Sequence, residues 1–434
     1  MDEEKGIDAV MPMKYFEYKE NALFCEDVLL SDLAEEYGTP LYVYSKNQII
    51  ENLHAMDAAL NGTEHLVCYA LKANANHAIL KLLADAGTGA DIVSIGELHL
   101  ALKAGFLPNK IVFAGVGKRD DEIEYALQQN IFSFNVESVP ELQAISRIAL
   151  RLGKRAKISL RINPDIDAQS HPYITTGLQT TKFGIAAPQA LEVYRYAATL
   201  PSLDVIGIHT HIGSQITKTE PFTDTARFVV SLIGQLREAG IHLTHIDFGG
   251  GIGVPYFNAL RHEALPVEDP SHDNMPQPSD VLNAVLPLLQ TTGCSIWMEP
   301  GRSLVADAGV LLTRVVYVKD NGVKKFIIVD GGMNDLLRPS IYHAHHQIVP
   351  LVLKTYEHQK VDVVGPICES TDFFAQDREL PNVAAGDNLA ILTAGAYGFV
   401  LSSNYNGRLR PAEILVNGER VRVIRPRETM GQLE

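Results

Sequence analysis

Short apolar runs alternate with segments of helical periodicity between residues 65 and 299. Eight runs are rich in β-branched and other apolar residues: HLVCYAL, ADIVS, KIVFAG, IFSFNV, KISLRI, DVIGIHT, LTHIDF and CSIWME. Strands that alternate with helices are typical of parallel βαβ units, and eight units in about 250 residues match the size of a (β/α)8 barrel. The pattern therefore predicts an α/β barrel, with a doubly wound parallel sheet as the alternative.

Two of the intervening segments show where helices begin and end. IGELHLALKAG has apolar residues at helical spacing and ends at Gly105, and DDEIEYALQQN opens with acidic residues that suit a helix N-terminus. Residues 254–280 depart from the repeat, because they are rich in Pro, Asp and His. They are predicted to form a long excursion from a βα loop.

The pattern changes after Arg302 to β-type runs separated by turn signals. AGVLLTRVVYVKDNGVKKFIIVDGG and AEILVNGERVRVIRP each place Asn-Gly between two strand-like runs, which is a strong hairpin signal. A mostly antiparallel C-terminal β-domain is therefore predicted. Residues 11–44 also alternate, as in YFEYKENALFCEDVLL, and can add a strand to that domain. The predicted parts are an N-terminal segment joining the β-domain (1–44), the barrel (45–304) and the C-terminal β-domain (305–434).

Composition narrows the range of partners. The 434 residues include 37 Lys and Arg against 52 Asp and Glu, and the net charge of −15 disfavours nucleic acids and anionic membranes. No apolar run reaches 18 residues and the start lacks a signal-peptide pattern, so we expect no membrane span. The four cysteines lie far apart without CxxC spacing, which fits a reducing cytoplasm. Small molecules or other protein chains are the expected partners.

Polar residues stand at the ends of most predicted strands. In a (β/α)8 barrel the carboxyl ends of the strands meet at one mouth, where the active site lies. We therefore expect the following residues to converge there: Lys72, Asp91, Ser94, Arg161, His209, His211, Gly249, Gly250, Gly251, Glu299, Pro300, Gly301 and Arg302.

Lys72 ends the first apolar run, in VCYALKANAN. A lysine at a barrel mouth is partly desolvated, which lowers the pKa of its amine and leaves the amine nucleophilic. A lysine that lies along apolar surface and forms a salt bridge fits the same pattern. The residue alone leaves both interpretations open.

The turn DFGGGIGVPY offers backbone N–H groups without side-chain obstruction, which suits a bound phosphate, and Ser214 in HTHIGSQ adds a hydroxyl. His209 and His211, two residues apart on a strand, and the histidines of YHAHHQ (342–347) are also candidate metal ligands. Neither group is completed by a carboxylate and cysteine at ligand spacing. We therefore expect no metal and favour His211 as a ring beneath a flat cofactor.

Two more residues are candidates for chemistry. Glu299 in MEPGR ends a buried run, and a carboxylate there needs a partner such as a pyridinium N–H or a neighbouring arginine. Cys368 in GPICESTD lies in a polar turn before Glu369, where it is a candidate acid or nucleophile. A free cysteine also commonly serves as a small core residue.

The motifs together resemble a known family. In the order seen in the fold type III pyridoxal-phosphate decarboxylases, the chain contains YALKAN, GADIVSIGEL, LRINP, HPYITTGLQTTKFGI, HTHIGSQ, DFGGGIG, MEPGR, GPICESTD and GAYG. It is most similar to the diaminopimelate decarboxylases, over nearly its whole length. The resemblance implies an alanine-racemase-type barrel, pyridoxal 5'-phosphate as cofactor and a homodimer with shared active sites. It implies decarboxylation of meso-2,6-diaminopimelate to L-lysine and CO2.

The resemblance also implies roles for single residues. Lys72 would hold the cofactor as a Schiff base, His211 would stack on its ring, and Glu299 would keep the ring nitrogen protonated. Cys368 would be the acid that protonates the carbanion left by CO2, reaching across from the partner subunit. The other implied cofactor-binding residues are Asp91, Ser214, Gly249, Gly250, Gly251, Pro300, Gly301, Arg302 and Tyr397.

Substrate choice rests on a smaller set. Arg302, Arg338 and Tyr342 match the residues that hold the distal carboxylate in the family, and a guanidinium is well shaped for that task. Glu369 stands where ornithine-type relatives carry aspartate, and Tyr397 is also a substrate-binding candidate. A substrate with a second amino-acid head explains the basic and acidic groups together.

Two other functions remain open from the sequence. One is a related decarboxylase that acts on arginine, ornithine or carboxynorspermidine. The other is a cofactor-binding or regulatory protein that has lost catalysis. Retention of Lys72, Cys368 and Glu369 together argues against the second.

Overall fold

The computed structural model describes residues 13–168, 176–177, 180–269 and 275–433. The chain divides into two units. Among the described residues, one unit comprises 49–168, 176–177, 180–254 and 275–305, and the other comprises 13–48, 255–269 and 306–433. Each unit is built on its own large sheet.

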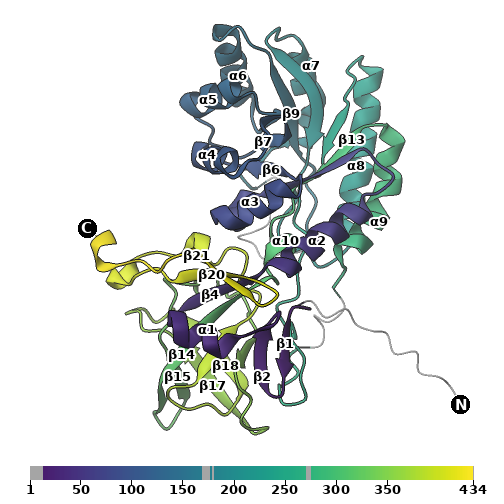
Figure 1. The fold of residues 1–434 in the computed structure, drawn as a ribbon. Helices are drawn as coiled ribbons and strands as arrows, with labels where there is room; N and C mark the ends of the chain where they lie inside the picture. The colour runs from purple at the N-terminus through teal and green to yellow at the C-terminus, as the bar shows by residue number, and fades with distance from the viewer. Residues whose placement is uncertain (1–12, 169–175, 178–179, 270–274, 434) are drawn as a thin grey trace, which may run out of the picture. The chain divides into compact units, whose positions relative to one another are not determined.

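The first unit is a closed barrel of parallel strands (Figure 1). In the order in which they pair, its strands are β5 (His65–Ala70), β6 (Gly89–Ile92), β7 (Ile111–Phe113), β8 (Ser133–Val136), β9 (Ala156–Asn163), β11 (Leu203–His209), β12 (His245–Asp247) and β13 (Ser295–Met298). β13 pairs with β5, which closes the ring, and the short β10 (Ile185–Ala186) lies beside β9. The predicted (β/α)8 barrel is confirmed, and the doubly wound alternative is wrong.

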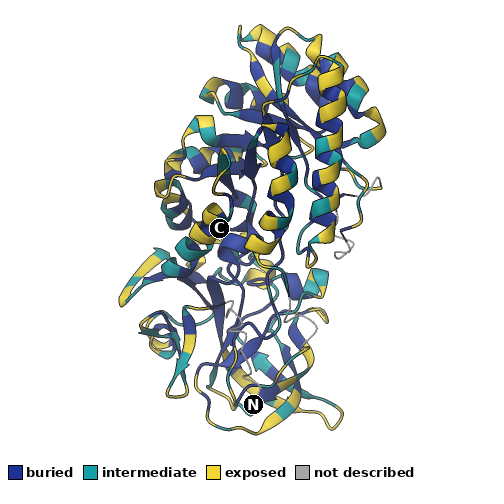
Figure 2. Ribbon diagram, turned by 90° about the vertical axis from the view of Figure 1, so that its right-hand side faces the viewer, coloured by how far each residue is buried: buried dark blue, intermediate teal, exposed yellow. Residues whose placement is uncertain are grey.

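Helices surround these strands, as Figure 1 shows. They are α2 (Lys46–Ala59), α3 (His77–Asp85), α4 (Ile95–Ala104), α5 (Asp120–Gln129), α6 (Val139–Arg151), α7 (Ala190–Ala198), α8 (Glu220–Glu238), α9 (Pro278–Leu289) and α10 (Arg302–Val305). The strands are largely buried and the outer helix faces are exposed (Figure 2), which explains why apolar residues predominate in most strand runs. α4 ends at Gly105, whose φ is 100°, and α5 begins at Asp120, as the sequence predicted.

The second unit is built on a mixed, mostly antiparallel sheet. Its central strands pair in the order β18 (Phe373–Pro381), β17 (His358–Val364), β15 (Lys325–Val329), β14 (Gly309–Asp320), β4 (Leu41–Ser45), β20 (Ala412–Asn417) and β21 (Arg420–Arg425). β19 (Asn388–Ile391) pairs with β14 and with β16 (Ile348–Pro350). The β14–β15 and β20–β21 pairs are antiparallel and turn at the two predicted Asn-Gly sites. Both hairpin predictions are confirmed.

The N-terminal segment adds its strand to this unit at residues 41–45 rather than within the earlier alternating stretch. β4 supplies a strand to the large sheet, where it pairs antiparallel with β14 and parallel with β20. The stretch YFEYKENALFCEDVLL instead forms a separate small sheet from β1 (Phe16–Lys19), β2 (Ala22–Cys25) and β3 (Val28–Leu29). Its strands are joined by tight turns, at which Asn21 and Glu26 have positive φ, so they pair locally. The helix α1 (Leu30–Tyr37) follows them.

The predicted excursion also differs from a simple barrel loop. Of its described residues, 255–269 belong to the second unit, whereas 254 and 275–280 belong to the barrel unit. Ala259, Leu260, Ala264 and Leu265 lie in the apolar core of the second unit. These apolar residues explain why the middle of the excursion packs there. Residues 270–274 lie outside the described part.

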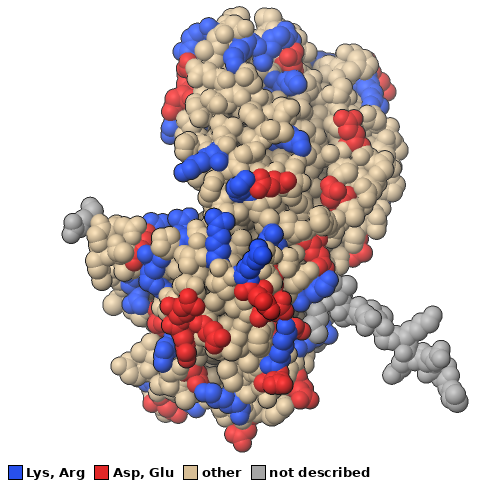
Figure 3. Space-filling model, viewed as in Figure 1, with Lys and Arg blue, Asp and Glu red and all other residues tan. Residues whose placement is uncertain are grey.

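Two observations concern membranes and nucleic acids as partners. No helix in the described part of the chain is long and apolar enough to cross a membrane. Lys and Arg are interspersed with Asp and Glu on the face shown in Figure 3. The net charge of −15 for the chain likewise disfavours a nucleic acid as a partner.

Candidate active site

Lys72 lies at the carboxyl end of β5, in the 3-10 turn Leu71–Ala73. Its Nζ atom is 2.7 Å from Oδ2 of Asp91, at the end of the adjacent β6. The Asp91 side chain is fully buried, whereas the Lys72 side chain is 38% exposed, so the amine can reach a ligand. Burial and the charge of Glu299 raise the pKa of Asp91 to about 7 against the opposing charge of Lys72. Asp91 can therefore exchange a proton with a neighbouring amine near neutral pH.

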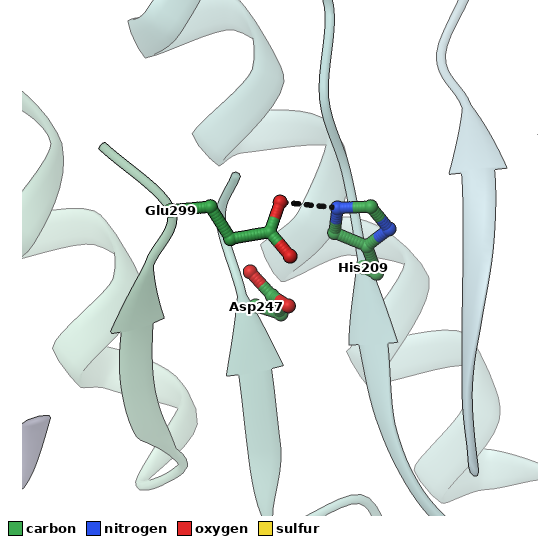
Figure 4. Close-up of side chains that lie close together, drawn as sticks. All are labelled: His209, Asp247 and Glu299. Atoms are coloured by element: carbon green, nitrogen blue, oxygen red, sulfur yellow. Dashed lines mark hydrogen bonds and ion pairs between the residues drawn. The ribbon is translucent and has the colours of Figure 1, made fainter. Parts of the chain in front are cut away.

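An acidic cluster lies at three further strand ends (Figure 4). His209 ends β11, Asp247 ends β12 and Glu299 directly follows β13. His209 Nε2 is 3.1 Å from Glu299 Oε2. Asn135 of β8 donates from Nδ2 to Asp247 Oδ2 at 2.7 Å and to Glu299 Oε1 at 3.1 Å. Because all four side chains are buried, their contacts decide where charge resides.

The two carboxyl groups of this cluster take different charge states. Burial raises the pKa of Asp247 well above its ordinary value, and the neighbouring Glu299 raises it further. Burial acts in the same direction on Glu299, but the charge and hydrogen bond of His209, together with Lys72, bring the pKa of Glu299 well below its usual range. Near neutral pH the proton therefore resides on Asp247 and the negative charge on Glu299.

A glycine turn follows β12. Gly249 and Gly251 have φ of 67° and 98°, which favours glycine. A Cβ on Gly250 would lie 2.2 Å from the backbone oxygen of Glu299, and one on Gly251 would lie 2.2 Å from that of Gly213. Only glycine fits these positions, so the backbone of the turn lies directly against the ends of β13 and β11.

His211 is a neutral ring beside this turn. Gly250 donates its backbone N–H to Nδ1 of His211 at 3.1 Å, so Nδ1 carries no proton. Burial and the positive charges of Arg161 and Lys72 lower the pKa of His211 well below its ordinary value. A neutral, flat imidazole at the barrel mouth is what stacking on an aromatic ring requires.

Arg302 and Ser214 form an anion-binding pair. Arg302, the first residue of α10, is buried and donates from Nη2 to Ser214 Oγ at 3.0 Å. The neighbouring Pro300 is fixed by its carbonyl, which accepts from the backbone N–H of Ala70 at 3.1 Å. A guanidinium, a hydroxyl and the N–H groups of a glycine turn are suitable donors for a phosphate.

Three buried polar atoms of the mouth have no hydrogen-bond partner within the described residues: Asp91 Oδ1, Asn135 Oδ1 and His209 Nδ1. Buried polar atoms are normally satisfied by protein, water or a ligand. The mouth thus combines an accessible amine, an anion-binding pair, a neutral ring and a buried carboxylate. This set suits a carbonyl compound that carries a phosphate and a basic ring nitrogen.

Comparison with known proteins agrees with this chemistry. Residues 46–306 match the family model described as "Pyridoxal-dependent decarboxylase, pyridoxal binding domain". The diaminopimelate decarboxylase of Aquifex aeolicus is 48% identical over 414 residues, which cover 95% of each chain. That of Vibrio cholerae is 48% identical over 423 residues and covers 97% of this chain and 98% of its own. The chain belongs to the diaminopimelate decarboxylase family.

Solved structures of this family have the same fold. The enzyme from Helicobacter pylori, complexed with L-lysine, is 44% identical, with a TM-score of 0.87 over 93% of this chain and 98% of that one. The enzyme from M. jannaschii, also with L-lysine, is 38% identical, with a TM-score of 0.90 over 98% and 97% of the two chains. The alanine-racemase-type barrel with a β-domain is therefore confirmed, as is pyridoxal phosphate as the cofactor.

The barrel mouth fits this family cofactor. Lys72 could supply an amine for its carbonyl group, and Arg302 with Ser214 and the glycine turn would suit its phosphate. His211 would supply a neutral ring, and Glu299 would supply an anionic carboxylate for the ring nitrogen. Asp91 Oδ1, Asn135 Oδ1 and His209 Nδ1 are buried without a partner among the described residues, which is consistent with a polar ligand at the barrel mouth.

The other predicted site residues, which include Tyr397, lie in the β-domain unit. Arg338 is buried at the start of α11 (Arg338–Tyr342), and Tyr342 is the last residue of that helix. Cys368 is exposed, and its N–H donates to Asn406 Oδ1 at 2.9 Å. Glu369 accepts a hydrogen bond from the hydroxyl of Tyr405. Tyr397 has φ of 54° in the turn GAYG.

One polar residue of the motifs, Ser94, has a structural role at a helix start. Ser94 caps α4 by accepting from the N–H of Glu97 at 3.2 Å. Part of HPYITTGLQTTKFGI lies outside the described residues.

The sequence analysis did not identify Asn135 and Asp247 as site residues. Each is a polar residue near the end of a barrel strand, which was a usable signal for both.

The acidic cluster also has the ligand types of a metal site. His209, Asp247 and Glu299 each offer one ligand atom, and these atoms lie within 4.8 Å of one another. In the structure, Glu299 already accepts from His209 and Asn135. A buried carboxylate at this place would also suit the ring nitrogen of the family cofactor, so these ligand types do not by themselves require a metal.

The unequal charges of Glu299 and Asp247 lead to a testable difference. Asp247→Asn resembles the protonated side chain and is expected to change the dissociation constant for pyridoxal phosphate by less than about 3-fold. Glu299→Gln removes the charge that faces the ring nitrogen and is expected to raise that constant about 10-fold or more. Titration of each apoprotein with pyridoxal phosphate, followed by absorbance, gives both constants. Similar losses for the two variants would show that the charge assignment is wrong.

Proposed function

We propose that the protein catalyses the decarboxylation of meso-2,6-diaminopimelate to L-lysine and CO2 with pyridoxal phosphate. The observation that carries this proposal is the barrel mouth, in which Lys72, Glu299 and the Arg302–Ser214 pair present the groups the cofactor needs. Relatives named diaminopimelate decarboxylase at 48% identity support the choice of substrate. Structures of two relatives hold L-lysine.

Each residue at the barrel mouth has its own proposed role in the reaction. When bound, the cofactor provides an electron sink for the bond that breaks as CO2 leaves. Lys72 would supply the amine that holds the cofactor, and Asp91, 2.7 Å from that amine, would accept or return its proton. Glu299 would keep a proton on the ring nitrogen. His211 would cover one face of the ring, and the glycine turn with Pro300, Gly301, Arg302 and Ser214 would hold the phosphate.

We propose that catalysis requires a homodimer. Cys368, carried in the β-domain, would donate the proton that replaces CO2, and the family resemblance assigns it to the active site of the partner subunit. Its exposure is compatible with this role. The cofactor-binding role would belong to the barrel over 45–304, and the proton donor to the β-domain formed by 1–44 and 305–434. The four free cysteines fit the reducing cytoplasm that we propose as its location.

The distal end of the substrate is assigned to a second group of residues. Arg302, Arg338 and Tyr342 would bind the distal carboxylate, and Glu369 would bind the ammonium group beside it. Tyr397 would contact both cofactor and substrate. Two basic groups would be poorly matched to the bare amine of ornithine, which favours a substrate with two amino-acid heads.

Turnover with a panel of amino acids tests the choice of substrate. CO2 release from meso-diaminopimelate, ornithine, arginine and carboxynorspermidine should be measured with the same holoenzyme. We expect meso-diaminopimelate to have the highest kcat/KM. A higher value for any of the others would replace the proposed substrate, and no release from any of them would favour a regulatory protein.

Arg338→Met is expected to weaken recognition of the distal carboxylate. Losing a charge-assisted hydrogen bond costs about 1.5–3 kcal/mol, or roughly 10- to 150-fold in kcat/KM for meso-diaminopimelate. L-lysine retains this carboxylate, because CO2 leaves from the other end, so inhibition by L-lysine should weaken similarly. Cadaverine has no carboxylate, and its inhibition constant should change little. An equal change for cadaverine, with a lower Tm, would indicate that Arg338 only stabilises the fold.

A further inference from the structure

The histidine-rich segment YHAHHQ and the described excursion meet around Arg338, within the β-domain unit. His346 Nε2 is 2.7 Å from Nη1 of Arg338. The Arg338 Cζ atom lies 4.4 Å from the centre of the Tyr256 ring. The rings of Tyr256 and His346 are 5.0 Å apart at 76°. All three side chains are buried, so their packing fixes the direction of the guanidinium.

The hydrogen bonds of His346 determine its protonation. Its Nδ1 atom lies 2.8 Å from the carbonyl oxygen of Leu392, and a carbonyl only accepts, so Nδ1 carries the hydrogen. The guanidinium of Arg338 only donates, so Nε2 offers its lone pair. His346 is therefore a neutral acceptor with a defined tautomer, which rules out a protonated ring at this place.

Tyr256 provides the second contact. Its aromatic face attracts the guanidinium without a negative charge. Neither His346 nor Tyr256 brings a carboxylate to Arg338, so both contacts can orient the guanidinium without placing a negative charge beside it. A carboxylate in either position would compete with the carboxylate of a substrate.

The chain around His346 is itself held by two side chains, Arg378 and Gln347. Arg378 of β18 donates from Nη1 to the carbonyl of His346 at 2.9 Å. Gln347 exchanges two side-chain hydrogen bonds with the backbone of Leu260 in the excursion, at 2.8 and 3.0 Å. The next histidine, His345, is engaged differently, because it lies 2.7 Å from Glu268 and accepts from Arg378 at 2.9 Å. Of the two histidines, His346 is the one that contacts Arg338.

We propose that His346 is a positioning residue for substrate choice, which holds Arg338 in the orientation that receives the distal carboxylate, with Tyr256 as the supporting face. This inference rests on the role proposed for Arg338. It gives the excursion and the motif YHAHHQ a task in specificity, in place of the metal site that the histidine spacing allowed.

Paired substitutions test the proposal. His346→Leu removes the acceptor, whereas His346→Gln keeps an oxygen close to the position of Nε2. We expect His346→Leu to raise KM for meso-diaminopimelate and Ki for L-lysine together, by roughly 5- to 30-fold, with a much smaller effect on kcat. His346→Gln should recover most of the loss. Cadaverine inhibition and the absorption spectrum of the bound cofactor should stay close to those of the parent.

A second pair keeps the test decisive if His346→Leu does not fold. Tyr256→Leu removes the aromatic face and should raise the same two constants, and Tyr256→Phe, which keeps the face, should lose less. His343→Asn changes an exposed histidine of the same motif and is the control. Unchanged KM in both His346→Leu and Tyr256→Leu would overturn the proposal, as would an equal loss for cadaverine.

The outcomes separate this inference from the proposed function. If Arg338→Met leaves KM for meso-diaminopimelate unchanged, the assignment of Arg338 to the distal carboxylate fails. If Arg338→Met raises KM while the His346 and Tyr256 variants do not, only the positioning role fails. If neither the parent protein nor any variant turns over meso-diaminopimelate, the proposed decarboxylase function is wrong.

Discussion

Replacing Lys72 with alanine is expected to reduce decarboxylation below about one thousandth of the parent rate. The Nζ atom of Lys72 is the accessible amine at the barrel mouth, 2.7 Å from the buried Asp91. Without it, the protein cannot hold the cofactor covalently, and the visible absorption of the bound cofactor should disappear. Absorption spectra of the purified variant and the parent give this result directly.

Chemical labelling locates the attachment. Borohydride treatment of the parent, followed by peptide mapping, should place the reduced cofactor on Lys72. Lys81→Ala is a matched control, because Lys81 lies on α3 of the same unit and forms an exposed ion pair with Asp85 at 2.8 Å. That variant should keep both spectrum and activity. A label on any lysine other than Lys72 would remove the central assignment.

Mixing two inactive variants is expected to restore activity. If the sites are shared in a homodimer as proposed, Lys72→Ala would lack the cofactor attachment and Cys368→Ala the proton donor, so neither homodimer would have a complete site. In a mixed dimer, one of the two shared sites would combine an intact Lys72 with an intact Cys368. Random mixing in equal amounts should therefore give about a quarter of the parent activity. Activity is measured after subunit exchange has been verified with differently tagged chains.

The double variant Lys72→Ala/Cys368→Ala supplies the control for this experiment. In a mixed dimer with the parent chain, both shared sites lack one of the two groups, so exchange should lower the activity of the parent chains. Complete exchange between the single variants with no return of activity would contradict the shared-site model.

The barrel could be predicted from the sequence because the alternation of apolar runs and helical segments is a local pattern that repeats eight times. Strands buried on both sides are largely apolar, and runs such as HLVCYAL, ADIVS and KIVFAG show this clearly, while the alternation of runs and helical segments supplies the rest of the signal. Closure of the sheet through the β13–β5 pair depends on long-range packing that no single run encodes, and only the number of runs indicated it. The small sheet β1–β2–β3 was missed because alternation does not say which strand will be the partner.

Lys72 and Glu299 could be proposed as site residues because each stands at the end of an apolar run, and the structure places both at the carboxyl ends of barrel strands. Their roles toward the cofactor stay predictions. Asp247 and Asn135 were missed, since their role depends on side-chain contacts between strands far apart in the sequence. The same holds for His346, whose tautomer is fixed by Leu392 and Arg338 in three dimensions.

The most direct test of the account is CO2 release from meso-diaminopimelate by protein first stripped of cofactor and then restored with pyridoxal phosphate. We expect no release from the stripped protein, and, after restoration, equal amounts of CO2 and L-lysine. Circular dichroism should show that the stripped protein remains folded. Folded protein that binds pyridoxal phosphate through Lys72 and yet releases no CO2 from meso-diaminopimelate would contradict the account.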